Sequence, residues 1–266
     1  MSARRRLYDL DYNLWRNIME LYSRNPLEHV YLLYDLIYEI DNTDVYFSID
    51  NNRINGYVLV WHGPNVNGVH LWGNVSNLVE FIPFEKNTII HVYNRENLDL
   101  VEKLLESKNI VFKTMYYLDM LVSEKEFTPY HPEKAVKLDP ENKHHVREFV
   151  ELKKIQGRII DYTSAQALLS RTRYYGVFVD TKLVSIACCY LRTNEVWIIG
   201  DVYTHPEYRG HGYAKIVTSA MTRDAIVSGA KALLHVAENN EPAIRVYTRI
   251  GYRKVMKKPW IFIESS

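Results

Sequence analysis

Apolar and polar positions follow two periods along the chain, and each change of period marks a predicted element. In some segments apolar residues recur every three or four positions, as on one face of a helix, and in others they alternate with polar residues, as in a half-buried strand. In the first half, helices are expected over 8–22, 26–40 and 98–107. Strands are expected over 45–49, 54–61, 69–75 and 87–92, with one or two more within 111–122.

The pattern lapses around the prolines of residues 128–132 and 139–140, which indicates a linker, and then starts again. Helices are expected over 141–155, 164–171, 213–228 and 242–249. Strands are expected over 177–179, 183–191, 196–203 and 232–237, followed by a strand pair over 252–263.

Short stretches agree between the two halves. Val69–Val75 (VHLWGNV) aligns with Val196–Val202 (VWIIGDV) at an offset of 127, and Ile89–Val92 (IIHV) aligns with Leu233–Val236 (LLHV) at an offset of 144. The offset grows from 127 to 144, so 17 residues of the second half have no counterpart in the first. These agreements indicate a tandem duplication in which the second half carries an additional segment.

The fold class expected from this order is α/β of the α+β type, with two mixed-sheet halves and flanking helices. Residues 1–127 would form a degenerate first domain, and residues 133–266 a complete second one. The additional segment contains Arg209-Gly-His-Gly-Tyr213, between a strand and a helix. Glycines let backbone N–H groups at a helix N-terminus approach an anion closely, and Arg209 adds a charge-assisted hydrogen bond. The loop is therefore a candidate phosphate site.

Two motifs in this half resemble those of the GCN5-related N-acetyltransferase (GNAT) superfamily. Arg209-Gly-His-Gly-Tyr-Ala214 is similar to the family's acetyl-CoA loop, Arg/Gln-x-x-Gly-x-Gly/Ala. Asn240-Glu-Pro-Ala243-Ile-Arg-Val-Tyr247-Thr-Arg-Ile-Gly251-Tyr252 is similar to its Asn-x-x-Ala-x-x-x-Tyr-x-x-x-Gly-Phe/Tyr segment. The resemblance covers residues 177–252. The paired layout also resembles acyltransferases with a degenerate GNAT half before an active one, such as the glycine N-acyltransferases.

The resemblance implies a role for each matching residue. Acetyl-CoA would be the cosubstrate, and its binding residues would be Val202, Tyr203 and Thr204 for the pantetheine arm, Arg209, Gly210, His211, Gly212, Tyr213 and Ala214 for the pyrophosphate, and Asn240 for the arm from the neighbouring strand. Tyr247 would lie near the sulfur and assist the leaving thiol. The aligned residue of the first half is Leu104, which is consistent with an inactive first half.

The sequence does not single out one residue as the general base. His235 in LLHV matches a histidine that acts as base in some members of the family, but His91 recurs in the first half, where no loop exists, which favours a structural role. Glu195, Asp201 and His205 flank the same strand and are the alternatives. Lys254, Lys257 and Lys258 could neighbour nucleotide phosphates or form a solvated face, and Asp161 and Tyr162 mark a segment that would line the acceptor site.

The function expected is transfer of an acetyl group to an amine, borne by a small molecule, a peptide or a protein. A CoA-binding regulatory module without turnover and an enzyme using a longer acyl-CoA are the alternatives, and a homodimer is left open. The formal net charge of +1 gives no electrostatic case for nucleic acid or membrane, and Arg4–Arg6 is interpreted as a solvated tail. The only cysteines are Cys188 and Cys189, and no metal-ligand spacing, apolar signal segment or membrane span is recognised, which favours a cytoplasmic protein without metal.

Overall fold

The computed structural model describes residues 11–264, so Arg4–Arg6 and the start of the first expected helix lie outside the described part. The chain divides into two compact units. The first contains the described residues up to Leu118 together with those from Met256 onward, and the second is Asp119–Val255. The chain therefore enters the second unit once and returns to the first for its final strand.

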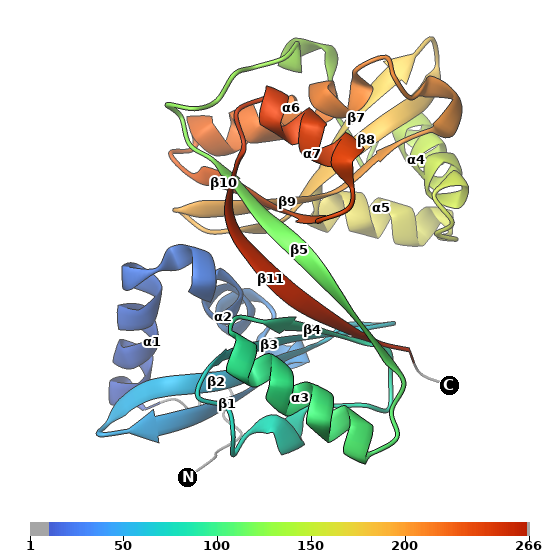
Figure 1. Ribbon diagram of the computed structural model, residues 1–266. Coiled ribbons are helices and arrows are strands. Elements are labelled where there is room, and N and C mark those ends of the chain that lie inside the picture. Colours follow the sequence, from blue (N-terminus) through green and yellow to red (C-terminus); the bar gives the residue numbers. More distant parts are fainter. Residues whose placement is uncertain (1–10, 265–266) are drawn as a thin grey trace. The chain divides into compact units, whose positions relative to one another are not determined.

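The first unit is a mixed sheet with helices on both faces (Figure 1). Its strands, in spatial order, are β1 (Thr43–Asp50), β2 (Arg53–His62), β3 (Asn67–Gly73), β4 (Thr88–Val92) and the end of β11 (Arg253–Ile263). Its helices are α1 (Tyr12–Arg24), α2 (Pro26–Tyr38) and α3 (Arg95–Ser107). The pairs β1–β2, β2–β3 and β4–β11 are antiparallel, while β3 and β4 run parallel.

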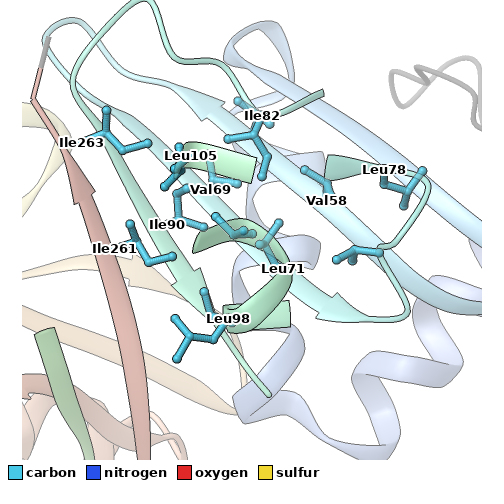
Figure 2. Close-up of a cluster of buried hydrophobic side chains, with 14 residues drawn as sticks. Val58, Val69, Leu71, Leu78, Ile82, Ile90, Leu98, Leu105, Ile261 and Ile263 are labelled. Carbon is cyan, nitrogen blue, oxygen red and sulfur yellow. The ribbon is translucent and has the colours of Figure 1, made fainter. Parts of the chain in front are cut away.

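Alternation along β2 explains why helices cover both faces of this sheet. Val58 and Val60 pack in a core with α3, β4 and β11, and Figure 2 shows Val58 in this buried cluster. Tyr57 and Leu59 point to the other face and pack against α1 and α2. Successive side chains of a strand leave opposite faces, so this strand contributes to two cores.

The second unit is also a mixed sheet with helices on both faces, and it is built from one continuous chain segment. Its strands, in spatial order, are β6 (Val136–Lys137), β7 (Arg173–Val179), β8 (Lys182–Arg192), β9 (Val196–Thr204), β10 (Lys231–Ala237) and the end of β5 (Phe112–Val122). Its helices are α4 (Lys143–Ile155), α5 (Tyr162–Arg171), α6 (Tyr213–Val227) and α7 (Glu241–Arg249). On β8, Ile186 and Cys188 pack toward α4 and α5, and Ala187 packs toward α6.

The duplicated strands occupy equivalent places in the two units. β3 pairs in parallel with β4, as β9 does with β10. Between β3 and β4 lies a short 3-10 helix, Val79–Phe81, whereas the glycine-rich turn and α6 lie between β9 and β10. The growth of the offset along the sequence therefore corresponds to α6 and the turn before it.

Two expectations differ from the structure in detail. The strand pair expected over 252–263 is one continuous strand, β11, because this segment has no glycine, asparagine or aspartate at which a tight turn would form. Residues 111–122 form one strand, β5, which agrees with the one or two strands expected there. The segment interpreted as a linker is packed, since the Tyr130 N–H donates to Ser219 Oγ at 2.8 Å. Among the described helices, none has the length and apolar content needed to cross a membrane.

Candidate active site

The parallel strands β9 and β10 part at the point where the predicted cofactor site begins. Their paired register runs from Val196–Lys231 to Ile199–Leu234 and, among the described residues, goes no further. On its other side β9 stays paired with β8 as far as Thr204. The backbone of Val202–Thr204 therefore lies at an open edge, where an extended ligand can form strand-like hydrogen bonds.

The loop after β9 holds its glycines in conformations that favour glycine. Gly210 has φ +86° and Gly212 has φ +85°, both in the left-handed region. The Arg209 side chain donates from Nε to the Thr204 carbonyl oxygen at 3.3 Å, and its own N–H donates to the Pro206 carbonyl at 3.2 Å. The N–H of Arg209 is thus used within the turn, so the donors offered by the loop begin at Gly210.

The N-terminus of α6 presents these donors together. Gly212 is the N-cap and provides no side-chain cap. Among the described residues, none accepts a hydrogen bond from the N–H groups of residues 210–215. Unpaired N–H groups at the positive end of a helix dipole form a site for an anion.

One cavity of about 720 Å³ brings the predicted residues together. Its lining includes every residue expected to hold the cosubstrate, namely Val202, Tyr203, Thr204, Arg209, Gly210, His211, Gly212, Tyr213, Ala214 and Asn240. Tyr247 lines it as well. The described lining contains the cations Arg209, Lys215, Arg245 and Arg249 and no carboxylate, so its charge suits an anionic ligand.

Tyr247 is placed by the helix that begins at the second motif. Asn240 caps α7 by accepting the Ala243 N–H on its side chain at 3.3 Å. Tyr247 follows on the buried face of this helix, with 7% of its surface exposed. Burial raises the pKa of Tyr247 to about 12, so the phenol remains protonated, and able to donate a hydrogen bond, through the whole neutral range.

His235, the other predicted catalytic residue, does not line this cavity. Its side chain is buried on β10, and Nδ1 lies 2.7 Å from Asp119 Oδ1 of β5. Its counterpart His91 lies in the first unit, with the centre of its ring 3.9 Å from that of Trp260 and 4.2 Å from that of His70. His235 therefore contacts a carboxylate, whereas His91 lies against two aromatic rings.

The alternative bases are engaged or distant. Asp201 accepts hydrogen bonds from Gln156 and Tyr174 and pairs with Lys153; burial alone would raise its pKa, but these partners hold it below the ordinary value, so it is a poor base. His205 is buried and accepts the Glu207 N–H on Nδ1 at 3.3 Å.

The remaining candidates lie away from the cavity. Glu195 precedes β9, at the opposite end of this strand from the cavity. Lys258 is buried in the first unit with Nζ 4.2 Å from the centre of the Tyr93 ring, which excludes the solvated face expected for it. Asp161 caps α5 by accepting the Ser164 N–H at 2.8 Å. Among the described residues, no group of three or more His, Cys, Asp or Glu side chains could hold a metal ion.

The sequence reading missed Tyr130 and Lys215, which both line the cavity. Lys215 Nζ lies 3.8 Å from the centre of the Tyr130 ring, a cation–π contact beside the N-terminus of α6. A β-carbon on Gly212 would lie 3.2 Å from the Tyr130 hydroxyl. Lys215 follows the loop motif directly and could have been found there, whereas Tyr130 lies in the segment interpreted as a linker and carries no local signal.

Part of the chain matches a protein-family model, and the whole chain is similar in fold to solved structures. Residues 174–261 match the family model described as FR47-like protein, while no curated protein sequence matches the chain significantly. A GCN5-related N-acetyltransferase-like protein from Streptococcus suis 89/1591 is 17% identical with a TM-score of 0.63, over 94% of this chain and 99% of that one. A tandem GNAT protein from the clavulanic acid biosynthesis pathway is 13% identical with a TM-score of 0.63, over 100% and 98%.

A GCN5-related N-acetyltransferase from Sphaerobacter thermophilus is 12% identical with a TM-score of 0.62, over 98% of this chain and 94% of that one. At these identities the likeness concerns the fold. The predicted α/β fold class and the predicted resemblance to the GNAT superfamily are confirmed: the chain has the fold of GNAT proteins, a tandem one among them, and its residues 174–261 match the FR47-like family.

Proposed function

We propose that the second unit is an acetyl-CoA-dependent N-acetyltransferase that acetylates an amine. The observation that carries this proposal is the content of the 720 Å³ cavity. It combines the unpaired N–H groups at the start of α6, the open edge of β9 and the buried Tyr247, and its described lining has no carboxylate. These features match the phosphates, the amide-containing arm and the thioester of one elongated anionic ligand.

Acetyl-CoA fits these residues by its chemistry. The N–H groups from Gly210 to Lys215 would hold the pyrophosphate, supported by the charges of Arg209 and Lys215. The backbone of Val202–Thr204 would hydrogen-bond the amides of the pantetheine arm, as a neighbouring strand would. Asn240, at the start of α7, would contact the same arm from the β10 side.

Acetyl-CoA supplies the acetyl group as a thioester; the amine nitrogen forms the new C–N bond, the C–S bond breaks, and the thiol is released. The chain must therefore accept the proton lost by the amine and stabilise the leaving sulfur. A thiol with a pKa of about 8.5 is a much stronger acid than Tyr247, so proton transfer from this phenol to the thiolate is unfavourable. Tyr247 would instead donate a hydrogen bond to the sulfur.

The Tyr247→Phe substitution tests this role. Because only the hydroxyl is removed, we expect kcat to fall about tenfold while the dissociation constant of acetyl-CoA stays within about twofold. Steady-state rates of thiol release and calorimetric titration measure the two quantities. An unchanged kcat, or a loss confined to binding, contradicts a role of the hydroxyl in thiol departure.

We assign the proton acceptor to His235. If Nδ1 keeps its proton on Asp119, Nε2 is the basic nitrogen of the neutral ring. His235 does not line the cavity, so the proton would reach it through water. The Asp119 contact is the observation that favours His235 over Asp201, whose carboxylate is held by Lys153.

The His235→Asn variant keeps an amide that can donate to Asp119 but lacks a base. We expect kcat at pH 7 to fall at least tenfold, since general bases contribute about 10²–10⁴-fold, with acetyl-CoA affinity retained. The acid limb of the pH profile of kcat/KM should also disappear. A variant that loses thermal stability and retains the wild-type pH profile would show that His235 is structural.

We further propose that the first unit takes no part in the chemistry. It has the short helix Val79–Phe81 where the second unit has the phosphate-binding turn and α6. In this proposal the first unit is the degenerate GNAT-like domain, and the second unit, Asp119–Val255, carries the activity. The acceptor is an amine on a small molecule, peptide or protein.

The test of the proposed function is a pair of measurements on the full chain. Calorimetric titration should show micromolar or tighter binding of acetyl-CoA, and a panel of amines screened by thiol release should reveal turnover. Binding without turnover on any amine would support a regulatory CoA-binding module instead. Faster transfer from longer acyl-CoAs would show that the enzyme transfers a longer acyl group by the same type of reaction. Absence of acetyl-CoA binding would refute the proposal.

A further inference from the structure

β9 contains a bulge at the position where it leaves β10. In its register with β8, Cys188 lies opposite Gly200 and Ile186 lies opposite Tyr203. Ala187 therefore faces two residues of β9, of which the first, Asp201, has φ +49°. An extra residue of this kind bends a strand and increases its twist. The bulge begins at Asp201, two residues after Ile199, which is the last residue that pairs with β10.

The Asp201 carboxylate is held by four donors from outside the strand. It accepts from Lys153 Nζ, from Gln156 Nε2 at 2.8 Å and from the Tyr174 hydroxyl at 2.7 Å, and Arg158 Nη1 lies 3.5 Å away. The Lys153 and Asp201 side chains are only 2% and 9% exposed. We call these five residues the Asp201 cluster.

Burying the charges of the Asp201 cluster costs desolvation free energy, so core stability alone does not explain the cluster. Burial lowers the pKa of Lys153 and by itself would raise that of Asp201, so each charge needs the other to remain ionised. A buried ion pair is often replaceable by apolar side chains without loss of stability, and its best-attested use is to specify one conformation. A residue other than glycine at positive φ in a strand adds strain.

The first unit provides an internal comparison. The residues that align with Gly200 and Asp201 at the offset of 127 are Gly73 and Asn74. β3 pairs with β2 without a shift in register from Asn67 to Gly73, and it ends at Gly73, which has φ +67°. β9 instead continues past Asp201 to Thr204 and stays paired with β8 there. Among the described residues of the first unit, which lacks the phosphate-binding turn, no strand segment corresponds to Val202–Thr204.

We propose that Asp201 is a positioning residue for the cosubstrate, an inference that rests on the function proposed above. The Asp201 cluster holds the bulge, and the bulge keeps the backbone of Val202–Thr204 apart from β10 and open to the cavity. Asp201 does not line the cavity, whereas the next three residues do. It acts on the pantetheine arm through their backbone and leaves the phosphate site at α6 unaffected.

The test uses two ligands and two double variants. Acetyl-CoA needs both the open β9 edge and the α6 site, while adenosine 3′-phosphate 5′-diphosphate, which lacks the pantetheine arm, needs only the latter. Lys153→Met/Asp201→Val removes both buried charges and places a β-branched residue where φ is positive, which disfavours the bulge. Lys153→Met/Asp201→Asn also removes both charges but keeps a residue that tolerates this φ.

For the valine variant we expect acetyl-CoA to bind at least tenfold more weakly than to the wild type, with nucleotide affinity within about twofold. The acetyl-CoA affinity of the asparagine variant should lie between that of the wild type and that of the valine variant. Thermal unfolding of all three proteins identifies a variant that has failed to fold. Equal loss of both ligands, or unchanged acetyl-CoA binding, overturns the positioning role. A wild type that binds neither ligand overturns this inference together with the proposed function.

Discussion

The Gly212→Glu variant is expected to lose acetyl-CoA binding by about 1,000-fold, or about 4 kcal/mol. Three effects add. Gly212 has φ +85°, a conformation that costs other residues about 1–2 kcal/mol. The new side chain would start 3.2 Å from the Tyr130 hydroxyl. Its carboxylate would also lie at the N-terminus of α6, where it would occupy the N–H donors and repel the pyrophosphate. Calorimetric titration of acetyl-CoA measures the loss.

Gly229 offers a matched control on the same helix. It follows the C-terminus of α6, has φ +85°, and a β-carbon there would meet nothing within 4 Å. Gly229→Glu therefore introduces the same charge and the same backbone strain outside the cavity. Its acetyl-CoA affinity should equal that of the wild type. Equal weakening in both variants would indicate a general loss of structure, and tight binding by Gly212→Glu would remove the anion site from the proposal.

The geometry of the glycine-rich turn before α6 could be predicted because its residues are local. Glycines between a strand and a helix indicate a tight turn over a few residues, and the structure has Gly210 and Gly212 at positive φ there. The phosphate as the ligand of Arg209–Ala214 stays a prediction. The helix expected over 242–249 was also predictable, since the periodicity within α7, Glu241–Arg249, places Tyr247 on its buried face. The capping role of Asn240 was not predicted.

Interactions between distant segments could not be read in this way. Lys153 and Asp201 are 48 residues apart, and no sequence pattern distinguishes this buried lysine from the solvated ones near it. His235 was a candidate for its sequence context, but its partner Asp119 lies 116 residues earlier, on a strand expected to complete the other half. Tyr130 was not predicted as a site residue either, because the prolines around it indicate a linker and its contacts are with distant segments.

The continuous strands β5 and β11 show why the domain limits were hard to place. Each starts in one compact unit and ends in the other, with the division at residues 118/119 and 255/256. Composition changes mark linkers, but a strand that crosses between units has an ordinary strand composition throughout. The linker signal therefore fell on residues 128–132, which are packed within the second unit.

The wild type is expected to become less stable relative to an Asp35→Asn variant as the pH rises from 5 to 8. Asp35 is buried on α2, and none of the ion pairs between described residues involves its carboxylate. Burial, and secondarily the charge of Glu39, raises the pKa of Asp35 from 3.8 to about 8. The unfolded chain ionises this group near pH 4, while the folded chain keeps it protonated until about pH 8.

The sign follows from this difference. Stability contributed by the protonated Asp35 is complete below pH 4 and is lost as the pH rises to 8, because the unfolded state releases the proton first. At about 1.4 kcal/mol for each pH unit, the change between pH 5 and pH 8 is on the order of 4 kcal/mol in the free energy of unfolding. The amide of the variant does not titrate, so its own burial cost is the same at both pH values.

Urea unfolding followed by tryptophan fluorescence can isolate this effect. Trp15, Trp61, Trp72 and Trp260 belong to the unit that contains Asp35, so a Trp197→Phe background reports on that unit alone. Asp41→Asn, at an exposed carboxylate shortly after α2, is the control for removing a carboxylate from the same unit. If the Asp35→Asn difference varies with pH no more than the Asp41→Asn difference, Asp35 is ionised at pH 5 in the folded protein, and a cationic or hydrogen-bonding partner must reach it in solution.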